Sequence, residues 1–132
     1  MFEPDIVSLN TDDIVVSACQ SMENEDGFFG YCLRIENNSR DKIQILSQDL
    51  SITDDKGHHF GRTETGFHGE IPELNPGEYF EFEDSFSYDM SGFAVLYGSC
   101  RIIKERTSQV TNVKIPALEL FFNQSNFSAV LN

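Results

Sequence analysis

Apolar and polar residues alternate along much of the chain with a period of two, which is typical of β-strands with one buried face. The alternation runs over Ile14–Ser21 and again over Phe29–Glu36. It is most regular over Tyr79–Glu83, where Phe80 and Phe82 alternate with glutamates. This segment predicts a strand whose two phenylalanines face a core while its carboxylates face water.

Further extended segments follow the same rule and are separated by turn residues. Strands are expected over Ile43–Ile52, His58–Arg62, Phe93–Ile103 and Val110–Ile115. The segment Asp54–Gly57 is expected to form a turn, with Gly57 at positive φ. No window has a helical period, and the turns recur at the spacing expected of sandwiches. The chain is therefore predicted to be an all-β antiparallel β-sandwich of about seven or eight strands in two sheets.

The chain has 132 residues, of which 39% are hydrophobic, and this fits one domain with a hydrophobic core. We assign residues 14–120 to the sandwich, residues 1–13 to an acidic N-terminal extension and residues 121–132 to an aromatic C-terminal tail. The tail carries Phe121, Phe122 and Phe127. It could pack on the sandwich, pair with a second copy or remain loose, and we predict a homodimer through it.

The balance of charges disfavours several classes of partner. Nine basic residues against 22 acidic residues give a net charge of −13. A field of this sign repels phosphate backbones and anionic lipids, so we expect no nucleic-acid binding. No apolar stretch approaches the roughly 18 residues of a membrane helix, so we expect no membrane insertion. We expect a protein partner instead.

The cysteines and the first residues of the chain favour a cytoplasmic location. Cys19, Cys32 and Cys100 are odd in number and lack a Cys-x-x-Cys spacing. They lie on apolar, strand-like segments, so we expect buried, reduced thiols. The opening residues 1–13 lack the pattern of a signal peptide. A cytoplasmic protein is the prediction.

A glycine- and proline-rich stretch, Gly66–Glu78, is the most distinctive segment of the chain. Two glycines bracket a short turn, and prolines with a third glycine form a second bend before the next strand. The candidate contact residues are Gly66, Phe67, His68, Gly69, Pro72, Pro76 and Gly77. The stretch can be a tight turn, a phosphate cradle, or a loop that presents Phe67 and His68 to a protein partner. Glu64 and Glu70 oppose an anion there.

Three histidines close together in the sequence raise the question of a metal site. His58, His59 and His68 fall within 11 residues, and Asp54 lies close by in the sequence. Adjacent residues on a strand point to opposite faces, so at most one of His58 and His59 could join His68. The candidates for a weak divalent site are His58, His68 and Asp54; the alternative is that these are ordinary surface histidines. No cofactor is expected.

The acidic residues of the clearest strand have three interpretations. Glu78, Glu81 and Glu83 can form a solvated sheet face, a patch for a basic partner, or a charged edge that resists unwanted pairing. No Ser-His-Asp arrangement with a nucleophile elbow is present in the sequence. No residue set combines catalytic chemistry with an expected cleft, so no catalytic residue is predicted.

Several segments in order resemble the ApaG domain family, over about residues 14–120. They are Tyr31–Asn37, Ile43–Asp54, the glycine loop with Pro72–Glu78, Gly98, and Ile115–Leu120. Members of that family typically carry a Gly-x-Gly-x-x-Gly loop. This chain has its second and third glycines as Gly66 and Gly69, but Glu64 replaces the first.

The resemblance implies an immunoglobulin-like or fibronectin type III-like sandwich. It also implies a binding or adaptor module without established catalytic machinery, with a link to cobalt resistance and magnesium homeostasis. We therefore predict a non-catalytic module for protein recognition, not an enzyme. The alternatives are a small-ligand binder for a divalent metal or phosphorylated metabolite, and an enzyme acting on a phosphoester.

Overall fold

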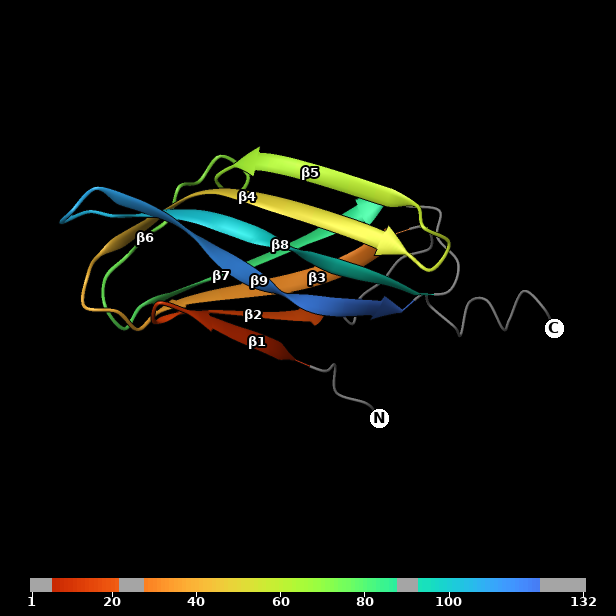
Figure 1. Cartoon of the computed structure of the whole chain (residues 1–132), viewed down its shortest axis with the longest axis horizontal. Coiled ribbons are helices and arrows are strands. Elements are labelled where there is room, and N and C mark those ends of the chain that lie inside the picture. The colour runs from red at the N-terminus through yellow and green to blue at the C-terminus, as the bar shows by residue number, and fades with distance from the viewer. Residues whose placement is uncertain (1–5, 22–27, 88–92, 122–132) are drawn as a thin grey trace.

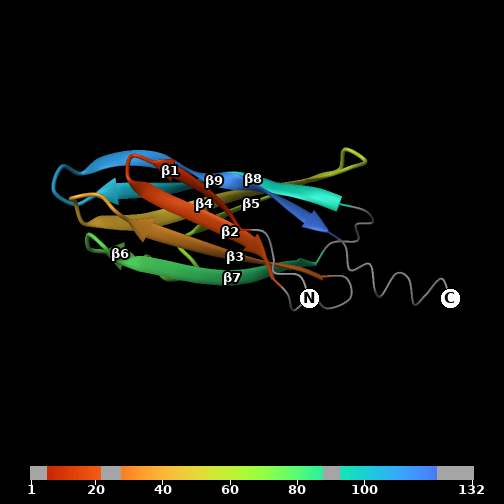
Figure 2. The ribbon, with the colours of Figure 1, turned by 90° about the horizontal axis from the view of Figure 1, so that it is seen from below.

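The computed structural model describes residues 6–21, 28–87 and 93–121 of the chain. These residues form two antiparallel sheets packed face to face, seen as two layers in Figure 2, and the predicted fold class is confirmed. The strands are β1 (Val7–Thr11), β2 (Ile14–Gln20), β3 (Phe28–Asn37), β4 (Ile43–Asp54), β5 (His59–Thr65), β6 (Glu73–Leu74), β7 (Tyr79–Ser87), β8 (Phe93–Lys104) and β9 (Gln109–Phe121). Two of them, β1 and β6, were not expected from the sequence pattern.

The order of the strands places two edges of the sandwich near each other. One sheet has the order β1-β2-β3-β7, and the other has the order β5-β4-β8-β9, with the short β6 also paired to β4 (Figure 1). Strands β7 and β5 are therefore edge strands of different sheets. A side-chain contact between them, described below, bridges the two layers.

Alternating side chains of both sheets fill the core, as the period of two predicts. Ile14, Val16 and Ala18 on β2 are buried, while the residues between them are half-buried. On β7, Phe82 is buried and Phe80 is half-buried against the core cluster. The predicted inward direction of both rings is confirmed.

The segment expected to be an N-terminal extension contributes a strand. Val7–Thr11 forms β1 and pairs with β2 along its whole length. The connection is a two-residue hairpin in which Asp12 and Asp13 have φ of 52° and 66°. Positive φ at both central positions is the type I′ geometry, which aspartate tolerates. The sandwich therefore begins before Ile14, and it includes part of the range 1–13.

The last strand continues past the proline that was expected to end it. Strand β9 passes through Pro116, and its register with β8 shifts between Leu96 and Gly98. A shift of this kind accommodates a residue without an N–H in an edge strand. At the end of β9, the Phe121 N–H donates to Gln20 Oε1 at 2.9 Å, and the Gln20 amide donates to the Phe121 carbonyl at 2.7 Å. Residues 122–132 of the predicted tail lie outside the described residues.

The three cysteines are free thiols. Cys100 is buried as expected, whereas Cys19 and Cys32 are half-buried and face each other across β2 and β3. Burial, with smaller effects from Cys19 and Glu83, raises the pKa of Cys32 to about 12. Burial also raises the pKa of Cys100 to about 12.

The described part of the chain contains no helix with the length and apolar character of a membrane span.

Candidate functional site

The glycine loop that follows β5 is a closed β-turn. The Phe67 N–H donates to the Glu70 carbonyl at 2.7 Å, and the Glu70 N–H donates to the Phe67 carbonyl at 3.0 Å. The two residues between them, His68 and Gly69, have φ of 50° and 86°. These values define a type I′ turn, so the structure agrees with the tight-turn interpretation of this stretch.

The backbone N–H groups of Gly66, Phe67, His68 and Glu70 already have acceptors within the chain. The Gly66 N–H donates to the Leu46 carbonyl at 2.7 Å, and the His68 N–H donates to Glu64 Oε1 at 3.3 Å. Gly66 has φ of 68°, and a Cβ at this position would overlap the Glu70 carbonyl oxygen. A phosphate cradle needs several convergent N–H groups that are free to donate. The geometry therefore argues against a phosphate cradle here.

Phe67 is not a surface residue, and the prediction that it is presented to a partner is wrong. Its side chain is 1% exposed. Its ring centroid lies 4.8 Å from that of Phe82 and 5.2 Å from that of Phe80, in edge-to-face contacts. The type I′ turn lets the backbone reverse sharply, so Phe67 points into the core while the next residue, His68, remains exposed.

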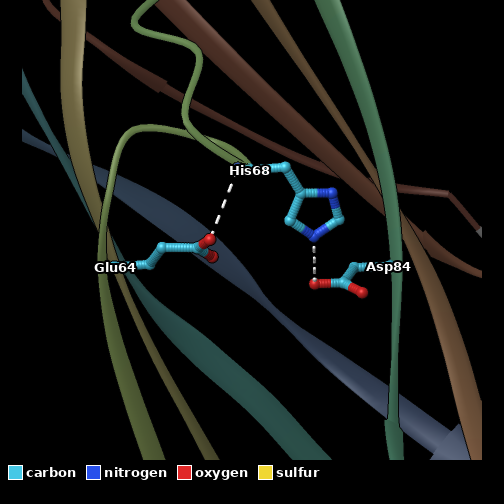
Figure 3. Close-up of side chains that lie close together, drawn as sticks. All are labelled: Glu64, His68 and Asp84. Carbon is cyan, nitrogen blue, oxygen red and sulfur yellow. Dashed lines mark hydrogen bonds and ion pairs between the residues drawn. The ribbon is translucent and has the colours of Figure 1, made fainter.

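A polar cluster surrounds the exposed histidine (Figure 3). Glu64 lies near the end of β5, His68 in the turn and Asp84 on β7. The potential ligand atoms of these three side chains all lie within 4.8 Å of one another. His68 Nε2 lies 3.2 Å from Asp84 Oδ2, and the imidazole packs edge-to-face on Phe82 at 5.0 Å.

Arg62 joins this cluster to the two sheets. Its Nη2 donates to Asp84 Oδ2 at 2.8 Å and to the Tyr31 hydroxyl at 2.9 Å, so it links β5 to β7 and β3. The guanidinium also lies 4.4 Å above the ring of Phe86. Burial, opposed by Arg62, raises the pKa of Tyr31, so this hydroxyl stays protonated at neutral pH.

Gln48 supports the cluster from strand β4. Its Nε2 donates to Glu64 Oε2 at 3.2 Å and to the Gly66 carbonyl at 3.4 Å. The side chain is 1% exposed, and among the described residues its Oε1 has no hydrogen-bond partner. Neither Arg62 nor Gln48 was predicted as a site residue. Arg62 lies two positions before Glu64, and therefore on the same strand face, and this spacing was the available signal for Arg62.

The predicted grouping of His58, His68 and Asp54 does not occur. His58 Nδ1 lies 3.0 Å from Asp54 Oδ2, and the His58 N–H donates to Asp54 Oδ1 at 2.7 Å, within the turn between β4 and β5. His59 instead lies 3.3 Å from Thr53, which agrees with adjacent histidines pointing to opposite faces. The seven residues of β5 span about 20 Å and separate this turn from His68.

The second bend of the glycine- and proline-rich stretch is a backbone support. Gly77 has φ of 88°, and its N–H donates to the Asn37 carbonyl at 2.7 Å. The Pro72 carbonyl accepts from the Ile45 N–H at 2.9 Å. Pro76 is exposed. This bend positions the start of β7.

The acidic residues of β7 are exposed, as predicted. Glu81 lies 3.9 Å from Arg34, and Glu83 Oε2 accepts a weak S–H hydrogen bond from Cys32 at 3.7 Å. Glu78, at the end of the preceding bend, accepts from the Asn75 N–H at 2.6 Å. These side chains do not belong to the cluster around His68, which uses Asp84 from the same strand.

The fold and the site define a small antiparallel β-sandwich with a polar cluster where two sheet edges meet. The ApaG domain family model matches residues 18–110. The chain belongs to this family.

Curated relatives agree with this membership, and solved structures agree with the fold. Protein ApaG from Brucella canis is 31% identical over 102 residues, covering 76% of this chain and 77% of the relative. Protein ApaG from Agrobacterium fabrum is 30% identical over the same length and coverage. A crystal structure of an ApaA protein from Bordetella pertussis superimposes with a TM-score of 0.71 at 22% identity, covering 90% of this chain and 94% of that one. A structural genomics target solved by X-ray crystallography gives a TM-score of 0.77 at 20% identity, covering 88% and 92%.

Proposed function

We propose that the protein is a non-catalytic recognition module that binds a protein partner with a basic surface through strand β7 and the bend that precedes it. The observation that carries this proposal is the exposed acidic row formed by Glu81 and Glu83 on edge strand β7 and by Glu78 just before it, in a chain with a net charge of −13. Such a field attracts positively charged surfaces and accelerates their association.

The position of β7 supports this choice of surface. Within the described residues, β7 pairs with β3 on one side and has no strand on the other. Tyr79 is 50% exposed next to the row, and Arg34 lies 3.7 Å above its ring. An aromatic ring beside carboxylates is a common contact for arginine and lysine side chains.

The geometry of the turn supports protein recognition over binding of a phosphorylated metabolite. The N–H groups of Gly66, Phe67 and His68 have acceptors within the chain. Glu64 and Glu70 place negative charge on both sides of them. His68, Pro76 and Gly77 remain exposed in the stretch between β5 and β7.

The surroundings of His68 support a non-catalytic role. Its ring bonds to Asp84, and its N–H bonds to Glu64. In the described part of the chain, no serine, threonine or cysteine is hydrogen bonded to His68, so the pair lacks a nucleophile to activate.

We place the protein in the cytoplasm, because three free thiols suit a reducing compartment. A contribution to cobalt or magnesium homeostasis remains a prediction from the family resemblance. Growth of a deletion strain at raised cobalt or lowered magnesium checks it.

Charge reversal on β7 tests the proposed function. We expect the purified protein to capture a partner from native lysate in the presence of EDTA, and Glu81→Lys with Glu83→Lys to abolish capture. Glu119→Lys, on the exposed face of β9, is the matched control and should capture normally. Hydrogen exchange of the complex should show protection along β7. Capture that survives the β7 reversal, or protection confined to other strands, contradicts the proposal.

A further inference from the structure

We propose that Glu64, His68 and Asp84 form a binding site for one divalent transition-metal cation of the Zn²⁺ class. Their candidate ligand atoms already lie within 4.8 Å of one another. Ligands on a common tetrahedral Zn²⁺, with bonds of roughly 2.0 to 2.2 Å, lie about 3.3 Å apart. Side-chain rotations that move each ligand atom by about 1 Å bring the three atoms to this tetrahedral spacing, and the backbone does not need to move.

The donor set selects the class of ion. One imidazole and two carboxylates suit Zn²⁺ and similar first-row cations, whereas Mg²⁺ prefers oxygen ligands in a regular octahedron. Three protein ligands leave the fourth position of a tetrahedral ion open. Water can occupy this position because His68 is exposed at the surface.

Each ligand is held by a partner outside the set of three. Gln48 Nε2 holds Glu64 Oε2 at 3.2 Å, and Arg62 Nη2 holds Asp84 Oδ2 at 2.8 Å. His68 is oriented by the type I′ turn and by its contact with Phe82 at 5.0 Å. Hydrogen-bond partners that orient the ligands are a recurrent feature of protein metal sites.

The local charge permits a cation despite the nearby arginine. Glu64 and Asp84 contribute −2 and Arg62 contributes +1, so the site carries −1 with a neutral imidazole. The Tyr31 hydroxyl and the Phe86 ring hold Arg62 beside Asp84. The cation would replace the hydrogen bond between His68 and Asp84 and leave the ion pair with Arg62 in place.

Gln48 supplies an independent observation that points to an occupant. Its amide is 1% exposed and reaches the site through Glu64, yet its Oε1 has no hydrogen-bond partner among the described residues. Buried polar atoms without a partner commonly mark the place of an ion or a water molecule.

Calorimetric titration of the full chain with Zn²⁺ tests the site. We expect one ion per chain and at least tenfold weaker binding in His68→Asn, because asparagine tolerates the positive φ of 50° but its side chain is too short to reach the ion. His58→Asn is the matched control, since His58 also contacts a carboxylate at 3.0 Å, and it should bind as the wild type does. Mg²⁺ should bind at least tenfold more weakly than Zn²⁺.

A second variant guards against a folding defect in the turn. Glu64→Gln keeps one acceptor oxygen for the His68 N–H but removes one charge and one acceptor, and it should also weaken binding at least tenfold. Zn²⁺ should shift the backbone NMR signals of Gly66–Gly69 and Asp84. Absence of Zn²⁺ binding by the wild type, unchanged affinity in both site variants, or loss of binding in His58→Asn overturns the proposal. Because partner capture is measured in EDTA, failure here and failure of the proposed function are separate results.

Discussion

Phe67 and Phe82 place their ring centroids 4.8 Å apart at an interplanar angle of 69°, which ties the exposed turn after β5 to the inner face of β7. His68 follows Phe67 in the turn, and Asp84 lies two residues after Phe82 on β7. Their polar atoms lie 3.2 Å apart. The buried aromatic contact therefore positions the polar cluster above it. Stability of the core and geometry of the cluster are linked at this point.

Phe67→Ala should lower the free energy of unfolding by about 3 to 5 kcal/mol, because it removes a fully buried ring and leaves a cavity between Phe80 and Phe82. Urea denaturation followed by circular dichroism measures the change. Ile71→Ala is the control in the same loop, because Ile71 is 42% exposed, and it should cost less than about 1 kcal/mol. Equal losses in the two variants would mean that Phe67 is not a core residue in solution.

Gly66→Ala should be more destabilising than Gly69→Ala, although both glycines have positive φ. Left-handed backbone costs an alanine about 1 to 2 kcal/mol at either position. At Gly66 the new Cβ would also overlap the Glu70 carbonyl oxygen, whereas no atom lies within 4 Å of a Cβ at Gly69. We expect a further loss of at least about 1 kcal/mol at Gly66, measured by urea denaturation. A larger loss at Gly69 would contradict this geometry of the turn.

The strands and their inward faces could be predicted because a period of two is a local property of the chain. Strand β7 shows this best, since the alternation of Phe80 and Phe82 with glutamates specifies its buried face without knowledge of its neighbours. The turn after β4 was also predictable from the sequence Asp54–Gly57, and the observed φ of 85° at Gly57 agrees with that prediction. Strand β1 was missed because its burial pattern is weak: three of its five residues are exposed.

The polar cluster could not be predicted, because it depends on how two sheets stack. Glu64 and Asp84 lie on edge strands of different sheets, and no local pattern indicates that these edges face each other. The burial of Phe67 was missed for a related reason. A phenylalanine next to a glycine turn resembles a presented side chain, and its inward direction depends on the φ of 68° at Gly66.

Asp54 should stabilise the protein in a pH-dependent manner. Burial raises the pKa of Asp54, but hydrogen bonds from the backbone of His58 and Lys56 and from the His58 side chain outweigh burial and lower it below the ordinary value. A carboxyl group with a lowered pKa in the folded state contributes stability above its unfolded pKa of about 3.9, and this contribution is lost as the pH falls through the folded value.

Asp54→Asn should therefore be less stable than the wild type at pH 7, and the difference should shrink as the pH falls below about 4. Urea denaturation at pH 7 and pH 3 measures both values. Asp55→Asn, at an exposed neighbouring position, should change the stability little at either pH. A difference between Asp54→Asn and the wild type that is as large at pH 3 as at pH 7 would exclude this role for the carboxylate.

The ion pair between Arg62 and Asp84 should stabilise the contact between the two sheets. Its side chains are 30% and 17% exposed, with the Nη2 to Oδ2 distance at 2.8 Å. A double-mutant cycle with Arg62→Met and Asp84→Asn should give a coupling energy of about 1 kcal/mol or more, because both groups are partly removed from water.

The pair of Arg106 and Asp41 is the matched control for this cycle. It has the same 2.8 Å distance between its nitrogen and oxygen atoms, but the arginine side chain is 74% exposed. Solvent and salt screen an exposed pair, and the flexible arginine loses entropy on forming it, so its coupling should be smaller. If the exposed pair gave the larger coupling, or if 1 M NaCl removed both equally, the bridge between β5 and β7 would contribute no more than a surface contact. A larger and salt-resistant coupling between Arg62 and Asp84 would instead mean that this ion pair holds together the two sheet edges that form the cluster.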